Sequence, residues 1–453
     1  MLFQLGPGPR QDHIAVTSNT TKSSNGKLTI AIDIGTSQSA VAVAYVSKDG
    51  TSFSTLVDSW PGQQNNLQLA RVPTAILYSE DDKLLACGAE VQQMLQATNL
   101  RPEDSPRYKW PQYFKTMLHS EQFAAVDPRV SIPLAKLYSD YLKYLLDHTR
   151  SHLRQYLGFD PWITAREDAT IVLSHPNKWR AAQQLVLRQA AIAAGLITPR
   201  DATSRLHFVE EAEAAASFAL LDHPLAKDTL KTGMKFVVCD AGGSTVDISS
   251  YVVKSQRSST SHVIEMDELA TPFSLDAGGI YVDLGFSLHF VEALASYLSN
   301  NPQEHQILLD DAMKEFETHS KRRFTTSNDT IQVKFGPRGL NIPEAGVWKG
   351  TYEVPGPTAT SFFQPSLKAT AAGLLGLKRS QEASVIILTG GFAESPYFKQ
   401  VLSERLEANP GCRVILANHP MSKAVVVGAL ALTHSMEQSI RIKRKPRRWT
   451  TWL

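Results

Sequence analysis

The chain has few cysteines, no long apolar run and almost no net charge, and each of these absences narrows what it can be. Three cysteines without a CxxC spacing argue against a disulfide framework or a zinc site and favour a reducing compartment. No apolar run approaches the roughly 18–20 residues that a membrane span needs. The first residues lack the basic and apolar regions of a signal peptide. A net charge of +2 does not favour nucleic acid or a membrane as a partner. We therefore expect a cytoplasmic protein.

What is present indicates an α/β protein with more than one domain. A chain of 453 residues is too long for one core, and stretches typical of strands alternate with long helical stretches. Apolar residues at helical spacing predict a long amphipathic helix over 133–157, and residues 280–324 are mostly helical. Residues 1–26 are expected to be a flexible lead-in. Residues 437–453 form a basic tail, expected to be solvated, which would also suit a nuclear location.

Capping residues predict where two of the helices begin and end. Asn177 is expected to be the N-cap of a helix that Gly195 ends as its C′ residue. Near the end of the chain, Ser395 is the expected N-cap of a helix with Pro396 in its first turn. Pro176 ends the strand that precedes Asn177.

Two strand–turn–strand units, far apart in the chain, carry the same chemical device. In LTIAIDIG-TSQ-SAVAVAYV, Asp33 precedes the turn Gly35-Thr36-Ser37; in VVCDAGGSTVDISSYVV, Asp240 precedes Gly242-Gly243-Ser244-Thr245. One such hairpin alone is more often an ordinary turn. Two copies suggest two similar lobes that face each other.

The composition of these turns indicates a phosphate site. Glycines let successive N–H groups converge on an anion, and the hydroxyls of Thr36, Ser37 and Thr245 could donate to phosphate oxygens. A carboxylate in the same place repels phosphate unless a hydrated Mg²⁺ ion lies between them. A third turn, Gly390-Gly391, has no acid at its base and precedes a helix. It suits the close approach of a sugar or base.

At this point the sequence resembles the nucleotide-binding domain of the 70-kDa heat-shock proteins, within the actin-like ATPase superfamily. The motifs are IAIDIGTSQSAVAV, VVCDAGGSTVDIS and VIILTGGFAESPYF, supported by RVPTAILY, IVLSHPNKW and VEEAEAAASFAL. The resemblance covers about residues 27–435. The segments YFKTML, EFETHSKRRF and SFFQPSL look most like the divergent branch called heat-shock 70-kDa protein 12, common in fungi.

The resemblance implies a fold of two lobes. Each lobe would be a mixed five-stranded sheet flanked by helices, with ATP or ADP and Mg²⁺ in the cleft between the lobes. The lobes would be residues 27–234 and 235–436, with the last helix returning to the first lobe.

The resemblance also implies roles for individual residues. Asp33 and Asp240 would hold the hydrated Mg²⁺, and the two hairpin turns would line the phosphates. The catalytic group would be Lys115, Glu211, Asp240 and Thr245. Lys115 would orient the attacking water, and Glu211, or its neighbour Glu210, would order the water and the cation. Asp247 would match an acid of the family that contacts these groups without touching the nucleotide. The residues expected to contact adenosine are Gly390, Gly391, Phe392, Lys321 and Arg322, the last two with an ambiguous register.

Plainer readings of these residues stay open. Lys115 could be a solvated surface lysine, the two glutamates could be exposed helical acids, and Pro176 could be only a strand terminator, although in the family its position couples nucleotide state to the partner domain.

Three positions also depart from the family pattern. Ser244 stands for a glycine, Ser422 for an acid, and Glu394 for an arginine. These departures put the nucleotide preference and the rate in question.

The function expected from this resemblance is slow, Mg-dependent ATP hydrolysis by a monomer whose lobe closure signals to a co-chaperone or client protein. Little sequence follows KAVVVGALAL, so we expect neither a β-sandwich peptide-binding domain nor a helical lid. A pseudo-ATPase that only binds nucleotide is an alternative. A sugar or metabolite kinase of the same superfamily is another, but it needs a catalytic aspartate that the second quarter of the chain does not display.

Overall fold

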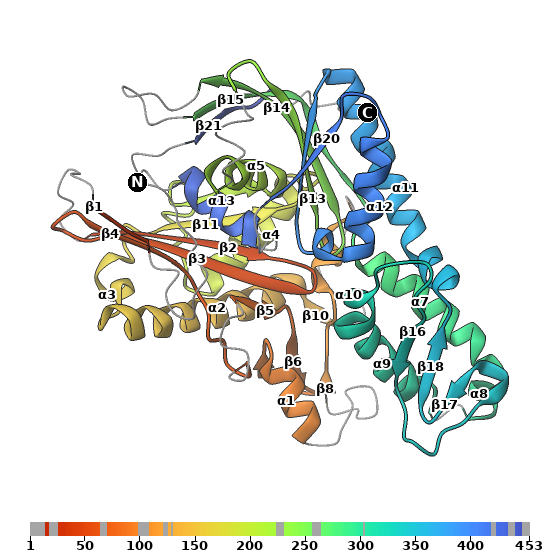
Figure 1. Cartoon of the computed structure of the whole chain (residues 1–453). Coiled ribbons are helices and arrows are strands. Elements are labelled where there is room, and N and C mark those ends of the chain that lie inside the picture. Colours follow the sequence, from red (N-terminus) through yellow and green to blue (C-terminus); the bar gives the residue numbers. More distant parts are fainter. Residues whose placement is uncertain are drawn as a thin grey trace, which may run out of the picture. The chain divides into compact units, whose positions relative to one another are not determined.

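The computed structural model describes residues 14–17, 26–63, 70–97, 108–120, 126–127, 130–222, 231–255, 264–301, 304–417, 423–433 and 440–445. Strands and helices alternate along these residues, as predicted for an α/β protein (Figure 1). Within these ranges no helix is long and apolar enough to cross a membrane.

The first sheet contains seven strands. Its spatial order is β1 (Ile14–Thr17), β4 (Thr51–Leu56), β3 (Gln38–Val46), β2 (Lys27–Ile34), β11 (Thr170–His175) and β12 (Leu206–Glu210), with β5 (Arg71–Pro73) paired to β3. β2, β3 and β4 are antiparallel, whereas β11 and β12 run parallel to β2. β1 comes from the segment expected to be a flexible lead-in, and these four residues pair with β4.

The second sheet contains six strands. Its order is β20 (Arg413–Leu416), β19 (Val385–Thr389), β13 (Lys235–Ala241), β14 (Val246–Ser255), β15 (Ile264–Leu275) and β21 (Ile440–Lys443). Without β1, β5 and β21, both sheets have the chain order third, second, first, fourth, fifth. The repeat inferred from the two hairpins therefore extends to the order of the strands. The expected size of five strands is wrong, because β1 and β21 pair with the edge strands β4 and β15, and β5 pairs with Gln38–Ala40 of β3.

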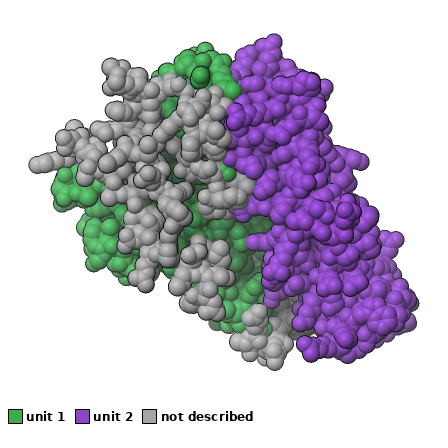
Figure 2. All heavy atoms as spheres, in the orientation of Figure 1, with its two compact units in different colours: residues 1–234, 249–273, 417–453 green, residues 235–248, 274–416 purple. Residues whose placement is uncertain are grey.

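By contacts between residues, the chain divides into two compact units (Figure 2). Unit 1 comprises residues 1–234, 249–273 and 417–453, and unit 2 comprises residues 235–248 and 274–416. The division falls within β14 and β15.

Helices and small sheets complete each unit. In unit 1 the helices are α1 (Glu90–Ala97), η2 (Phe114–Leu118), α2 (Leu134–Leu157), α3 (Pro161–Ala165), α4 (Ala181–Ala193), α5 (Glu211–Asp222) and α13 (Ala424–Thr433). Its small strands are β6 (Ile76–Ser79), β7 (Leu84–Cys87), β8 (Tyr108–Lys109), β9 (Val126–Asp127) and β10 (Ile132–Pro133). In unit 2 the helices are α7 (Ile280–Ala293), α8 (Ala295–Asn300), α9 (His305–Glu315), η3 (Phe316–Ser320), α10 (Lys321–Arg323), η4 (Pro343–Ala345), α11 (Gly356–Gln381), η5 (Phe392–Glu394) and α12 (Pro396–Glu407). Its small sheet is β16 (Ile331–Lys334), β18 (Thr351–Val354) and β17 (Val347–Trp348).

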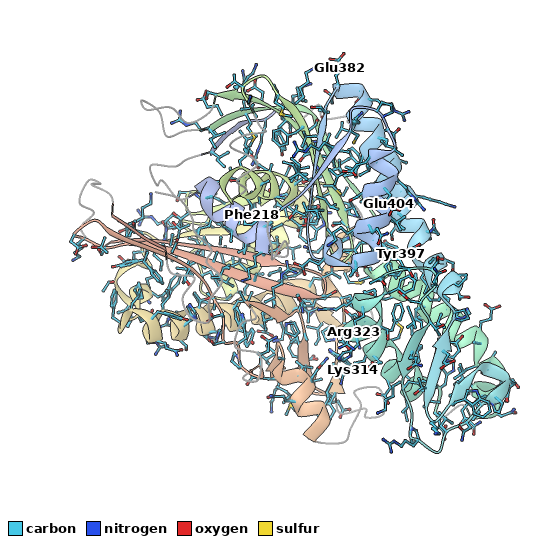
Figure 3. All side chains as sticks on the ribbon, in the orientation of Figure 1. Phe218, Lys314, Arg323, Glu382, Tyr397 and Glu404 are labelled. Atoms are coloured by element: carbon cyan, nitrogen blue, oxygen red, sulfur yellow. The ribbon has the colours of Figure 1, made fainter. Side chains whose placement is uncertain are left out.

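The two faces of the first sheet bury different residues, because successive side chains of a strand point to opposite faces. Large side chains such as Ile30, Ile32 and Val43 pack in one core with α2 and α4. On the other face, the alanines of β2 and β3 pack with α13 and with Ala214 of α5. Small residues let these helices approach the sheet closely. Phe218, labelled in Figure 3, lies on α5.

Most of the predicted helix boundaries are confirmed. The long helix is α2 (Leu134–Leu157); Ser395 is the N-cap of α12 with proline in its first turn, and Gly195 follows the end of α4 with a φ of 78°. The N-cap assigned to Asn177 is wrong. The chain makes a turn there, closed by the Trp179 N–H donating to the Pro176 carbonyl at 3.0 Å, and α4 begins later with Arg180 as its N-cap.

Part of the basic segment near the end of the chain is a strand instead of the expected solvated tail. β21 pairs in parallel with β15, from Ile264 opposite Ile440 to Asp267 opposite Lys443. Directly after it, the Arg444 guanidinium forms an ion pair with the buried Glu213 on α5. The Lys445 N–H donates to the Glu268 carboxylate at 2.8 Å. Two buried carboxylates thus anchor this segment to unit 1.

Candidate functional site

The first hairpin places Asp33 at the end of β2, buried beside the neighbouring strand β11. The Ser174 hydroxyl donates to one carboxylate oxygen of Asp33 at 2.7 Å. Gly35 begins the turn, and a Cβ there would overlap the Gln38 carbonyl. The turn is thus too tight for a side chain at Gly35, and its second residue, Thr36, is buried. At Gly35, where the sequence predicts a phosphate, the chain therefore presents its backbone and no side chain.

Lys115 and Glu211 come together in unit 1, although they lie far apart in the chain. The Lys115 Nζ donates to Glu211 Oε1 at 2.8 Å, and the two residues are only 4% and 6% exposed. Glu211, which forms this pair, is the first residue of α5, whereas Glu210 ends β12. The ring of Trp179 lies 5.9 Å from the ammonium. Lys115 is therefore not a solvated surface residue here.

Phe114 explains why Lys115 points inward. The 3-10 helix η2 begins after Tyr113, whose φ is 53°, and buries Phe114, Lys115 and Leu118. The Phe114 ring packs edge-on against Tyr138 of α2 at 5.0 Å. This aromatic anchor fixes the short helix, and with it the lysine next in sequence.

The second hairpin, in unit 2, mirrors the first. Asp240 lies near the end of β13, buried, and pairs in register with Thr389 of the neighbouring parallel strand β19. Gly390 follows with a φ of 95°, and a Cβ there would overlap the Asp240 carboxylate and the Ala241 carbonyl. The second and third sequence motifs are thus one structural unit, in which a glycine is required so that the aspartate has room.

A glycine pair that the sequence reasoning missed supports the second turn. The Gly279 N–H donates to the Gly242 carbonyl at 3.1 Å, and the Ile280 N–H to the Gly243 carbonyl at 2.8 Å. A Cβ at Gly278 would lie 2.5 Å from the Gly243 carbonyl oxygen. The available signal was the letters Asp-Ala-Gly-Gly, which occur at 240–243 and again at 276–279. The start of α7 therefore braces the predicted phosphate turn.

The residues expected beside adenosine have different environments. The Lys321 Nζ lies 2.6 Å from both carboxylate oxygens of the buried Asp283 and 3.4 Å from the Gly279 carbonyl. Burial raises the pKa of Asp283, and the ammonium opposes that rise. Arg322 instead is exposed, and its Nε donates to the Glu317 carbonyl at 3.3 Å. Of the two, Lys321 is held next to the glycine turn.

Phe392 is buried in an aromatic cluster. Its ring lies 4.0 Å from that of Phe398 and 6.4 Å from that of Phe363. Tyr397, labelled in Figure 3, contacts the same Phe363 at 5.1 Å. What this turn can present to a ligand is therefore its backbone around Gly391 more than the Phe392 ring.

The remaining candidate residues can be placed briefly. Ser244 and Thr245 are buried, and the Ser244 carbonyl accepts the Gly278 N–H at 3.2 Å. Asp247 is buried and accepts a hydrogen bond from the Ser274 hydroxyl at 2.6 Å. Ser37 accepts the Thr74 N–H at its carbonyl. Ser422 lies outside the described residues.

These features fit a nucleotide and a divalent metal ion. In each unit an aspartate is buried near a strand end, and a glycine beside it leaves no room for a Cβ: Gly35 follows Asp33, and Gly390 lies against Asp240. Glycine turns can direct N–H groups at an anion, and a buried carboxylate such as Asp33 in unit 1 or Asp240 in unit 2 is a suitable group to hold a hydrated cation. A bound metal would supply positive charge for the phosphates. The protein itself holds Lys115 against Glu211 and buries the turn residues Thr36 and Thr245.

The repeated strand order and the repeated Asp-x-Gly hairpins are consistent with an actin-like ATPase fold, and comparison with curated proteins supports an Hsp70-like relationship. Over 92% of its length the chain is 21% identical to human heat shock 70 kDa protein 12B and 19% identical to mouse heat shock 70 kDa protein 12A. It covers 70% of the length of each of these proteins. For human heat shock 70 kDa protein 12A the identity is 19%, over 95% of this chain and 72% of that protein. No family model matches the chain. The relationship to Hsp70-like proteins implies nucleotide binding with a divalent metal ion.

Proposed function

We propose that this protein is a slow, Mg-dependent ATPase of Hsp70 type, whose nucleotide state is reported to a protein partner. The observation that carries the proposal is the pair of Asp-x-Gly hairpins, each with a buried aspartate next to a glycine that tolerates no Cβ, which is Gly35 for Asp33 and Gly390 for Asp240. Phosphoryl transfer to water needs mainly positioning and charge neutralisation. Lys115, Glu211 and the turn hydroxyls would meet those needs.

A second candidate, nucleotide binding without hydrolysis, is favoured by one observation. The Lys115 ammonium, which would have to orient the attacking water, is paired with Glu211 at 2.8 Å in a buried setting. A lysine held this way contributes to the packing of unit 1 whether or not it acts on water. The two candidates differ in turnover and agree on binding.

The test compares Asp240→Asn and Asp240→Ala with the wild type. Because Asp240 is expected to hold the metal ion, both variants should lose Mg-dependent binding of ATP and ADP in isothermal titration. Asp81→Ala removes an exposed carboxylate of unit 1 and serves as the control, with affinity unchanged. Unaltered affinity in both Asp240 variants, with melting temperatures near that of the wild type, would show that the metal assignment is wrong.

Phosphate release, measured on the same samples, separates the two candidates. Slow release that depends on Mg²⁺ supports an ATPase, and binding without release supports a nucleotide-dependent scaffold. Turnover that requires a particular sugar would instead support a kinase.

A further inference from the structure

Arg71 lies in one row with Asp33 across three strands of the first sheet. Asp33 of β2 pairs with Ala40 of β3, and Ala40 pairs with Arg71 of β5. Residues that pair in register point to the same face of a sheet, and neighbouring strands are about 4.8 Å apart. The side chain of Arg71 must therefore extend over Ala40 to reach Asp33.

The small side chain of Ala40 makes this reach possible. Ala40 is buried within the alanine-rich face of the sheet, which also holds Ala42 and Ala31. The Arg71 Nη2 lies 3.8 Å from the Asp33 oxygen that does not accept from Ser174. The two oxygens of Asp33 are thus divided between a hydroxyl donor and a guanidinium.

The contact is weaker than a structural arginine–carboxylate pair. Such pairs commonly form two parallel N–H···O bonds at about 2.8 Å, whereas one long contact is present here. The Arg71 Nε is buried and has no hydrogen-bond acceptor among the described residues. The guanidinium, with a side chain 19% exposed, therefore has donors to spare.

The strand that carries Arg71 also holds the predicted phosphate turn. Pro73 pairs with Gln38, the residue directly after the turn, and the Thr74 N–H donates to the Ser37 carbonyl at 2.9 Å. The Thr74 hydroxyl is hydrogen-bonded to that of Ser39 at 2.7 Å. Arg71 is thus built into the support of the turn from Gly35 to Ser37.

We propose that Arg71 binds the terminal phosphate of a nucleoside triphosphate and so distinguishes it from the diphosphate. The proposal rests on the proposed nucleotide binding and adds Arg71, the first residue of RVPTAILY, to which the sequence motifs assigned no role. A guanidinium presents a rigid fork of donors that matches phosphate oxygens. A cation near Asp33 would compete with Arg71 for that carboxylate, which leaves the guanidinium available to phosphate.

The experiment measures the affinities of the full chain for ATP and ADP, with Mg²⁺, by isothermal titration. Arg71→Ala and Arg71→Gln are expected to lower the affinity for ATP by about tenfold to a hundredfold, because a charge-assisted contact is lost, and to change that for ADP little. Arg71→Lys keeps the charge and is expected to recover part of the ATP affinity. Arg154→Ala is the control, since that side chain is 54% exposed on α2.

The outcomes separate this proposal from the one on which it rests. Equal losses for ATP and ADP in the Arg71 variants would mean that Arg71 only supports Asp33, and no loss would remove it from the site; either result overturns the proposal. A wild-type chain that binds neither nucleotide would refute the proposed function itself. Melting temperatures without nucleotide identify a variant that is not folded, and the two remaining variants then decide.

Discussion

Lys115 and Glu211 form a buried ion pair that bears on stability and, under the proposed function, also on catalysis. Breaking a buried ion pair by removing one partner leaves the other charge without compensation, which costs about 3–5 kcal/mol. Replacing both partners by apolar residues of similar volume is often neutral. The pair therefore offers variants that separate the two roles.

We predict that Lys115→Met lowers the free energy of unfolding by about 3–5 kcal/mol, because Glu211 stays buried and unpaired. Lys115→Met with Glu211→Leu should recover most of that loss, and urea denaturation measures both. The control is Lys143→Met, whose exposed pair with Asp147 should contribute less than about 1 kcal/mol. Equal losses in the single and double variants would contradict the prediction.

Lys115 has a kinetic role in the same proposal. In Lys115→Ala, nucleotide affinity should remain nearly unchanged while phosphate release slows. An unaltered rate in the folded variant would leave the lysine with a structural role only.

At the scale of elements, helices α5 and α13 pack so closely that their backbones are nearly in contact. A Cβ at Gly428 of α13 would overlap the Ala214 carbonyl and lie 3.1 Å from the Phe218 nitrogen, both on α5. The Glu-Ala-Glu-Ala-Ala-Ala start of α5 is thus explained by a neighbouring helix that needs small residues opposite it. Since α5 also begins with Glu211, its position matters for the site.

We predict that Gly428→Val lowers the melting temperature strongly, because overpacking a close helix contact displaces backbone. The matched control is Gly376→Ala on α11, where a Cβ meets nothing within 4 Å. That change should stabilise the chain by about 0.5–1 kcal/mol through helix propensity. Similar effects of the two substitutions in thermal melts would contradict close packing of α5 on α13.

The existence of helices and strands was predicted more successfully than the residues at which they begin and end. The hairpins, α2 and the start of α12 follow from alternation, helical spacing and a Ser-Pro cap. The start of α4 was wrong because a turn closed by Trp179 precedes the helix. Asn177 has the local preference of an N-cap, but the chain forms this turn there instead. The sequence near Asn177 does not show which of the two conformations is more stable.

At the scale of the whole molecule, buried histidines should make stability depend on pH. Burial lowers the pKa of His175 to about 4, although the Pro176 carbonyl at 2.8 Å from Nδ1 opposes this, and Lys115, Arg180 and Arg444 add to the fall. Burial also lowers the pKa of His119 to about 3. Both side chains are therefore neutral in the folded chain and become protonated on unfolding at mildly acidic pH.

The sign follows from proton binding. Below the unfolded pKa of about 6.5, the unfolded chain binds more protons than the folded chain, so stability falls as the pH decreases toward 4. Each histidine should contribute a slope of up to about 1.4 kcal/mol per pH unit. We predict that His175→Asn reduces the slope of the melting temperature between pH 6.5 and 4, whereas His207→Asn, exposed on β12, does not. An unchanged slope in the His175 variant would contradict the assignment.

The sequence by itself determined the local chemistry: the two Asp-x-Gly turns, the third glycine turn and the strands and helices beside them. These depend on residues next to one another, whose conformational preferences and periodicity are visible in the chain. Only the tertiary structure decided that Glu211 meets Lys115, that Gly390 makes room for Asp240, and that Arg71 reaches Asp33 over Ala40. The physical reason is that strand register and helix packing bring together residues from distant segments, and a contact of that kind leaves no trace in local spacing.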